Sequence, residues 1–269
     1  MSNLSNHLRV TLVQINAGPD IQANLGQLKH LLSRVGSTDV IALPEVFAIR
    51  GSHQDYRDSA QSISGPLINF MASIAHRHNA WVLAGSIIEA SGQGIYNTSV
   101  LVNRRGDIQA SYRKMHLFEA EISPTQTIRE SDTYLAGDTP VVVDLDGWQC
   151  GMAICYDVRF PELFRHYSAN GAQLFFIPSN FTQNTGKDHW EVLLRARAIE
   201  NQCFVIAPNQ CGSDPHTKVE SYGHSMVIDP WGDVLTKIEE GEGAVTVTLD
   251  IHKLDQTRRR IPVLSHRKL

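Results

Sequence analysis

The 269-residue sequence predicts an α/β fold in which two packed sheets are flanked by helices. Short β-branched and apolar runs alternate with helical patterns in the first part of the chain, which is typical of layered α/β proteins. Antiparallel hairpin signals then interrupt this alternation. In total we expect about a dozen strands, which is more than one open sheet usually holds. Two sheets packed face to face accommodate them better.

The first part of the chain is expected to alternate strands with helices. Strands are assigned where apolar residues run without a break, and helices where apolar residues recur at helical spacing. Asp20 suits the N-cap of the first helix, and Gly36 suits its end. In chain order, the expected elements are a strand at 9–16, a helix at 20–35, a strand at 39–43, a helix at 66–78 and a strand at 81–88.

The later part combines hairpins with further strands and helices. Turn residues at 105–107, 146–147 and 230–232 each separate two apolar runs, which indicates hairpins. Residues 119–137 have weak periodicity and are expected to form a long loop, which at this length is often functional. The expected hairpin strands are 96–102 with 108–112, 141–145 with 149–154, and 225–229 with 233–238. Strands at 173–177, 204–207 and 244–249 and helices at 160–169 and 189–202 complete the pattern.

The composition excludes several classes of protein. Hydrophobic residues make up 42% of the chain, charged residues 19%, and the net charge is -4, which argues against a disordered chain. No basic excess is present to drive nucleic-acid binding through counterion release. Residues 1–9 lack the apolar core of a signal peptide, and no run approaches the ~18 apolar residues of a membrane span. We therefore expect one cytoplasmic domain over residues 1–269, without nucleic-acid or membrane partners.

The four cysteines, Cys150, Cys155, Cys203 and Cys211, form no Cys-x-x-Cys pair and are expected to be free thiols. Only Cys155 has a setting that favours chemistry. It ends an apolar run, and a helix is expected to begin near Pro161. A thiol at such a strand-to-helix turn lies near backbone N–H groups, which are expected to lower its pKa. The alternative is an inert, buried cysteine, which is common.

Two charged residues end other expected strands. Glu45 follows Ala42-Leu43-Pro44, where a carboxylate is costly unless it is paired or functional, and it could act as a general base. Lys114 follows the strand at 108–112, and its ammonium could stabilise an oxyanion. The alternative for each is an ordinary solvated charge. A glutamate, a lysine and a cysteine at the ends of three strands together point to nucleophilic catalysis more specifically than any one of them.

Three sequence blocks, 43–45, 112–118 and 155–162, resemble the signature blocks of the nitrilase, or carbon–nitrogen hydrolase, superfamily. The resemblance extends from the first strand to Arg267. It implies a nitrilase-like four-layer α-β-β-α sandwich, a triad of Glu45, Lys114 and Cys155, and chemistry without a metal or organic cofactor. It also implies a homodimer or a higher homo-oligomer, with the tail at 259–269 docked at the dimer interface.

The resemblance implies further site residues. Glu130 matches a second family glutamate that orients the lysine and the substrate amide. Arg159 and Thr185 match residues that bind the carboxylate in members acting on 2-oxo acid amides. The alternative for Arg159 is a structural salt bridge to Asp157 or Glu162. The residues expected to bind substrate are Tyr156, through its backbone N–H, together with Arg159, Asn180, Phe181, Thr185 and His189.

The runs at 186–200 and 221–232 resemble the amidase branch that acts on small carboxylated amides. They are more similar to amidases of deaminated glutathione than to omega-amidases of 2-oxoglutaramate or 2-oxosuccinamate. Two departures concern the expected pocket: Asn180 replaces a small residue, and 119–124 lacks the usual glycine-containing turn. The resemblance thus implies amide hydrolysis through a cysteine thioester. A nitrilase, a non-catalytic binding scaffold and a redox-sensing thiol protein are the remaining alternatives.

Overall fold

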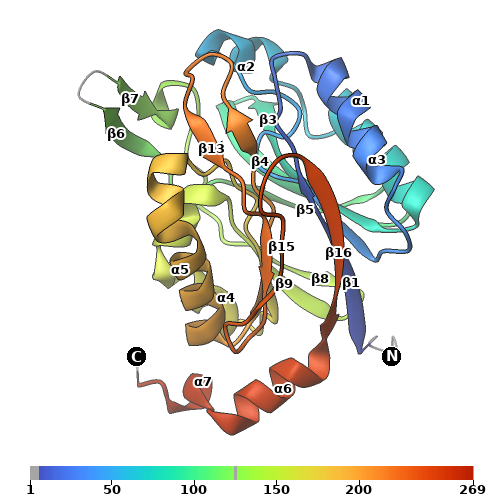
Figure 1. The fold of residues 1–269 in the computed structure, drawn as a ribbon, viewed down its shortest axis with the longest axis vertical. Coiled ribbons are helices and arrows are strands. Elements are labelled where there is room, and N and C mark those ends of the chain that lie inside the picture. Colours follow the sequence, from blue (N-terminus) through green and yellow to red (C-terminus); the bar gives the residue numbers. More distant parts are fainter. Residues whose placement is uncertain (1–5, 124–125, 269) are drawn as a thin grey trace.

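The computed structural model describes residues 6–123 and 126–268, in which two six-stranded sheets pack face to face (Figure 1). The first sheet has the strand order β16-β1-β2-β3-β4-β5, and the second has the order β15-β14-β11-β10-β9-β8. The first sheet consists of β1 (His7–Gln14), β2 (Val40–Ala42), β3 (Trp81–Ser91), β4 (Gly94–Val102), β5 (Ile108–Arg113) and β16 (Gly243–Asp250). The second consists of β8 (Val142–Leu145), β9 (Trp148–Met152), β10 (Leu174–Phe176), β11 (Phe204–Ala207), β14 (Met226–Ile228) and β15 (Val234–Lys237).

Helices cover the outer face of each sheet, so the molecule has the four layers α-β-β-α. Helices α1 (Ile21–Leu32) and α3 (Pro66–His78) lie on the first sheet, whereas α4 (Pro161–Ala169) and α5 (Gln183–Asn201) lie on the second (Figure 1). Asp20 caps α1 by accepting hydrogen bonds from two backbone N–H groups, as the sequence predicted. Helix α5 begins six residues earlier than expected, because its first two turns carry polar residues that give no apolar periodicity.

The alternation of side chains along the central strands explains the layers. In β2, Val40 and Ala42 point into the core between the two sheets, while Ile41 points into the core under α1 and α3. In β3, Trp81 and Leu83 face the second sheet in the same way. Because successive side chains of a strand point to opposite faces, one unbroken apolar run can serve two cores. The two-sheet prediction is therefore confirmed.

The two sheets repeat the same order of strand directions. Read from β16 to β5 and from β8 to β15, neighbouring pairs are antiparallel, parallel, parallel, antiparallel and antiparallel in both sheets. The parallel centre of each sheet ends in loops on the same side of the molecule. That edge carries Glu45 after β2 and Cys155 after β9.

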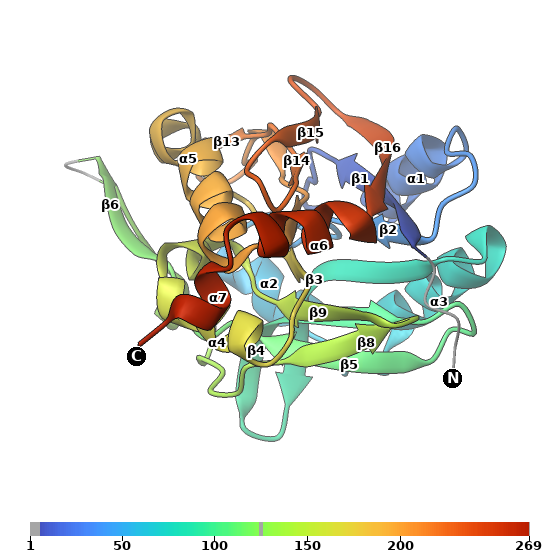
Figure 2. The same ribbon diagram turned by 90° about the horizontal axis from the view of Figure 1, so that it is seen from below.

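The prediction of a long loop at 119–137 is wrong for its first part, residues 119–132. Strands β6 (Glu119–Ser123) and β7 (Gln126–Arg129) pair as an antiparallel hairpin that projects from the body (Figure 2), and the 3₁₀ helix η1 (Glu130–Asp132) follows. Charged and polar residues are spread through both strands of this hairpin, so the sequence lacks the apolar alternation that would predict them. Pro124, which belongs to the predicted departure at 119–124, lies outside the described residues.

Five further strands and α-helices were not predicted, and all are short or polar. Helix α2, for example, buries none of its residues and is defined by a capping box between Ser52 and Asp55. The five are α2 (His53–Ser59), β12 (Cys211–Ser213), β13 (Glu220–Tyr222), α6 (Ile251–Arg260) and α7 (Val263–His266).

The C-terminal tail contacts its own chain. Gln202 Nε2 donates hydrogen bonds to the carbonyl oxygens of Thr257 in α6 and of Ile261 in the tail, and Arg260 lies over the Trp231 ring at 4.5 Å from its centroid. Docking of residues 259–269 at a dimer interface stays a prediction, and Leu269 lies outside the described residues. Within the described ranges, no helix combines the length and hydropathy needed to cross a bilayer.

Candidate active site

Tight backbone packing fixes the loop that carries Glu45. A Cβ atom at Gly85 would lie 1.9 Å from the Pro44 carbonyl oxygen, so only glycine allows this close approach. The Val46 N–H donates to Ser86 Oγ at 2.9 Å, and Gln210 Nε2 donates to the Glu45 carbonyl oxygen at 2.9 Å. The Glu45 carboxylate is therefore presented by a backbone held from both sheets.

Lys114 joins two carboxylates in the interior. Its Nζ lies 2.8 Å from Glu45 Oε1 and 2.9 Å from Glu130 Oε1, and its side chain is fully buried. Burial opposes the charged amine, but the carboxylates of Glu130 and Glu45 outweigh it and hold the pKa of Lys114 well above its ordinary value. The structure thus provides a permanent, desolvated ammonium group beside two carboxylates.

Each carboxylate also accepts hydrogen bonds from neighbouring amides. Asn97 Nδ2 donates to Glu45 Oε1, and the Asn180 backbone N–H donates to Glu45 Oε2, both at 2.8 Å. The Phe118 N–H donates to Glu130 Oε2 at 2.8 Å. Burial raises the pKa of Glu130 even though Lys114 acts in the opposite direction. These contacts leave little freedom in either carboxylate, and the structure confirms that Glu45, Lys114 and Glu130 lie together.

Cys155 lies at the turn that follows β9. It has a φ of 48°, a left-handed conformation that is unusual for a residue with a side chain, and its N–H donates to the Pro178 carbonyl oxygen. The 3₁₀ helix η2 (Cys155–Arg159) begins here, and α4 begins only at Pro161. Strained backbone of this kind is often found at functional sites.

The expectation of a lowered thiol pKa is wrong. Burial raises the pKa of Cys155 well above its ordinary value, and the Glu45 carboxylate raises it further, while Lys114 lowers it. The thiol is desolvated, and the longer helix begins too far along the chain to offset that cost. At rest the sulfur is a neutral thiol with a charged carboxylate in its environment.

Asp157 connects the Cys155 turn to the segment that carries Lys114. Its Oδ2 accepts from the Tyr112 hydroxyl and the Ile154 N–H, both at 2.8 Å. Its Oδ1 accepts from the backbone N–H of His116 at 3.1 Å and lies 2.7 Å from His116 Nδ1. One buried carboxylate thereby fixes the end of β5 in the first sheet against the end of β9 in the second.

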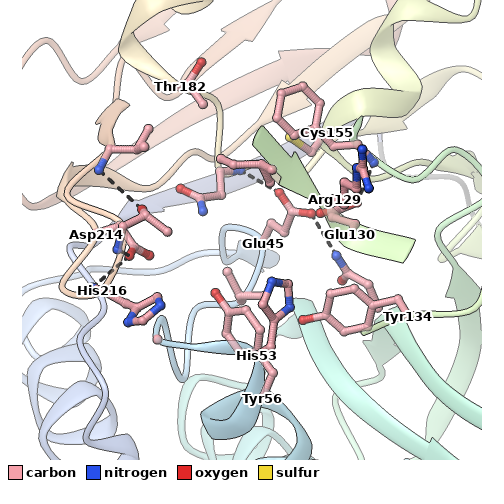
Figure 3. A pocket seen from close by; sticks show the side chains of 18 of the residues that line it. Glu45, His53, Tyr56, Arg129, Glu130, Tyr134, Cys155, Thr182, Asp214 and His216 are labelled. Atoms are coloured by element: carbon pink, nitrogen blue, oxygen red, sulfur yellow. Dashed lines mark hydrogen bonds between the residues drawn. The ribbon is translucent and has the colours of Figure 1, made fainter. Parts of the chain in front are cut away.

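Two pockets meet at Cys155. The wide pocket, with a volume of about 290 Å³, is lined on one side by Glu130, Arg129 and Cys155 and extends past Glu45 and His53 to His216 (Figure 3). The narrow pocket, of about 20 Å³, is lined by Tyr156, Arg159, Phe181 and Thr185. Four residues line both pockets: Phe118, Cys155, Asn180 and Thr182. The thiol therefore lies between two chambers of very different size.

The structure brings most of the predicted substrate-binding residues together. Five of the six line the narrow pocket, and the sixth, His189, contacts Arg159 with 3.3 Å between its Nδ1 and Arg159 Nη1. The Arg159 guanidinium lies over the Phe181 ring at 5.1 Å. In the described part of the chain, Arg159 forms no salt bridge to Asp157 or Glu162, and the Asp157 carboxylate contacts His116 and Tyr112 instead. The structural alternative for Arg159 is therefore wrong.

Several residues of the site were missed from the sequence. Asn97 lies inside β4, and Tyr134 follows η1 in the stretch expected to be a loop. The polar run Asn97-Thr98-Ser99 inside a strand that ends in Val-Leu-Val was the available signal for Asn97, whereas Tyr134 carries none. Among the described residues, no cluster of three or more histidine, cysteine, aspartate or glutamate side chains is arranged to hold a metal ion.

Known proteins resemble this chain over nearly its whole length. The model of the carbon-nitrogen hydrolase family matches residues 9–259. The chain is 38% identical to a deaminated glutathione amidase of Synechocystis, over 95% of this chain and 96% of that protein.

Two solved structures share the fold, which confirms the predicted nitrilase-like sandwich. The NitFhit protein of C. elegans has a TM-score of 0.90 and 35% identity, covering 97% of this chain, and this chain spans 65% of the NitFhit chain. Saccharomyces cerevisiae Nit3, a member of branch 10 of the nitrilase superfamily, has a TM-score of 0.88 and 30% identity, with 99% of this chain and 98% of that one covered.

Proposed function

This chain belongs to the carbon–nitrogen hydrolase family, and from that premise we propose that it hydrolyses an amide through a thioester on Cys155. One observation carries the proposal: a fully buried lysine bridges two carboxylates beside a strained, buried cysteine. Burying these charges is costly unless they are paired or used, and a nucleophile with a base and a cation is a catalytic constellation.

In the first half of the reaction, Glu45 accepts the proton of the Cys155 thiol as the sulfur attacks the amide carbonyl carbon. The raised pKa of the thiol makes this base necessary, because little thiolate exists at neutral pH. Two of the three hydrogens of Lys114 Nζ point to carboxylates, and the third is available for the developing oxyanion. The backbone N–H of Tyr156, at the start of η2, supplies a second donor.

In the second half, Glu45 returns the proton to the departing amine as the tetrahedral intermediate collapses to a thioester. A water molecule then attacks the thioester carbonyl carbon while Glu45 accepts its proton. Collapse of the second intermediate breaks the C–S bond, and the sulfur regains a proton. Glu130 keeps Lys114 in place throughout, since it accepts a second hydrogen bond from the ammonium beside that to Glu45.

For the acyl part of the substrate, we propose a small 2-oxo acid whose carboxylate binds Arg159 and Thr185 in the narrow pocket. The planar guanidinium of Arg159 suits a carboxylate, and no acidic residue in the described part of the chain occupies it. Deaminated glutathione is the favoured substrate, because relatives of this chain are amidases of that compound. An omega-amidase acting on 2-oxoglutaramate is the second candidate, since Arg159 and Thr185 in the narrow pocket would bind the carboxylate of its acyl part in the same way.

The relative turnover of the two substrates tests this proposal. We expect the wild type to hydrolyse deaminated glutathione with the higher kcat/KM, and we expect the variant Cys155→Ala to hydrolyse neither. A preference for 2-oxoglutaramate of more than about tenfold, which is 1.4 kcal/mol, would make the chain an omega-amidase. Undiminished hydrolysis by Cys155→Ala would eliminate the mechanism itself.

We also propose that the chain functions as a homodimer in a reducing compartment such as the cytoplasm. All four cysteines are free thiols, as the mechanism requires of Cys155. Val192 and Ile199 are exposed apolar residues on one face of α5, 67% and 49% accessible, and a second copy would cover them. A monomer in sedimentation velocity at micromolar concentration would contradict the dimer.

A further inference from the structure

The position of Glu45 determines which half of the substrate enters the wide pocket. Glu45 and Glu130 line the wide pocket and not the narrow one, whereas Cys155 lines both. In the proposed reaction the departing nitrogen must lie beside the group that protonates it. The nitrogen, and whatever is attached to it, therefore lies on the side of the wide pocket.

The wide pocket is much larger than a primary amide requires. Ammonia is the amine product of a primary amide and is about the size of a water molecule, whose share of liquid volume is about 30 Å³. The wide pocket has a volume of about 290 Å³. The narrow pocket, of about 20 Å³, has room for little more than a carboxylate, so the rest of a 2-oxo acyl half also lies in the wide pocket. The wide pocket holds that part and still has space for an amine part of several non-hydrogen atoms, which a primary amide would leave without contacts.

Two buried polar atoms in the wide pocket have no hydrogen-bond partner in the described part of the chain. They are the Tyr134 hydroxyl and Asn97 Oδ1, on side chains that are 5% and 2% exposed. The Tyr134 hydroxyl points into the pocket toward His53 (Figure 3). A buried polar group without a partner is costly, so each position favours a ligand that supplies one. Peptide N–H and C=O groups are suitable partners.

Three exposed side chains of a kind that binds anions line the wide pocket, and the buried carboxylate of Asp214 lines it as well. Arg129 is exposed and forms no ion pair or hydrogen bond through its side chain among the described residues. Its cross-strand neighbour Glu119 accepts a hydrogen bond from Ser131 instead. The rings of His53 and His216 lie on the same pocket. Arginine is permanently charged and binds carboxylates in a bidentate manner.

We propose that Asn97, Tyr134 and Arg129 are the residues of the wide pocket that determine specificity for the amine half of the substrate, which in deaminated glutathione is a dipeptide that ends in a carboxylate. In this arrangement Asn97 and Tyr134 bind the peptide groups next to the scissile bond, and Arg129 binds the terminal carboxylate. The inference rests on the proposed function and extends it, because it names the residues that separate a peptide amide from a primary amide.

The test compares kcat/KM for deaminated glutathione, which is the 2-oxoglutaryl amide of cysteinylglycine, with kcat/KM for 2-oxoglutaramate, which has the same acyl half. We expect Arg129→Gln to lower the ratio of the two values about tenfold, the range of one charge-assisted hydrogen bond. Arg129→Lys should retain most of the ratio. Arg105→Gln, at a position 84% exposed in a distant hairpin turn, is the matched control and should leave the ratio unchanged.

Two further measurements separate binding from a structural role. A peptide substrate with a terminal carboxamide should be hydrolysed less efficiently by the wild type, and Arg129→Gln should then have no further effect. Tyr134→Phe should lower the ratio without lowering the thermal midpoint of unfolding, because the hydroxyl has no partner to lose. Hydrolysis of both substrates with an unchanged ratio in Arg129→Gln and Tyr134→Phe would overturn this inference alone. Hydrolysis of neither substrate by the wild type would overturn the proposed function as well.

Discussion

At the scale of single residues, the central feature is a neutral nucleophile beside charged partners. Burial and Glu45 raise the pKa of Cys155, while Lys114 lowers it. The protein thus does not store a thiolate. It holds a base, Glu45, and a cation, Lys114, that act when the sulfur attacks the carbonyl carbon. Stabilisation of that transition state is what increases the rate. The same arrangement limits reaction of the resting thiol with other electrophiles.

Removal of the Glu130 charge should make the thiol more acidic, because Glu130 is one of the groups that raise the pKa of Cys155. Below its pKa, a thiol has a thiolate fraction that grows tenfold for each unit by which the pKa falls. We therefore expect Glu130→Gln to alkylate faster with iodoacetamide at pH 8 than the wild type, by about twofold to tenfold. Amide hydrolysis should fall, since Lys114 loses one of its two carboxylates.

The control for this experiment is Glu240→Gln, which changes the net charge equally at an exposed position outside both pockets. It should leave the alkylation rate unchanged. Slower alkylation in Glu130→Gln would contradict the electrostatic account, because it would mean that Glu130 lowers rather than raises the pKa of the thiol.

The sequence predicted the site residues unevenly at this scale. Glu45, Lys114 and Cys155 each stand at the end of an apolar strand and within a recognisable block, so their proximity could be inferred. Tyr134 could not be inferred, because its importance comes from a hydroxyl left without a partner by the fold. The pKa of Cys155 was predicted in the wrong direction, since burial cannot be read from the chain alone.

At the scale of elements, the site depends on contacts between strand ends that belong to different sheets. Asp157 accepts hydrogen bonds from groups on both sides of this junction, including Tyr112 from β5 and Ile154 after β9. Among residues 6–123 and 126–268, no strand pairing joins β5 of the first sheet to β9 of the second. This buried carboxylate is thus the polar connection that sets the Cys155 turn against the Lys114 segment.

Asp157→Asn should weaken this junction, because an amide NH₂ group would face two donors in place of an accepting oxygen. We expect the free energy of unfolding to fall by about 2–4 kcal/mol, the range for breaking a buried charged hydrogen-bond network. Urea unfolding followed by circular dichroism measures this. Asp255→Asn, at an exposed position of α6, is the control. A loss below about 0.5 kcal/mol in Asp157→Asn would show that the junction is held by apolar packing instead.

Prediction of the elements succeeded where burial imposes a period. β11 begins and ends at the expected residues, and α3 does so as well, because both carry a strong apolar pattern between clear end signals. The β6–β7 hairpin was missed because its strands are charged and project from the body (Figure 2). It is nevertheless the element that brings Arg129 and Glu130 to the wide pocket.

At the scale of the whole molecule, the two sheets have the same order of strand directions, and their parallel centres pack face to face. Glu45 and Lys114 come from the first sheet, and Cys155 and Asn180 come from the second. The fold class could be predicted because the number of strands exceeded one sheet. The relation between the two sheets, and therefore the division of the site into a wide and a narrow pocket, required the structure.

The most direct measurement of the central claim is mass spectrometry of the enzyme quenched with acid during turnover of deaminated glutathione. We predict that the peptide containing Cys155 gains the mass of one 2-oxoglutaryl group, in an adduct that hydroxylamine removes, and that peptides containing Cys150, Cys203 and Cys211 gain none. Turnover without any adduct on Cys155, together with undiminished hydrolysis by Cys155→Ala, would contradict the account.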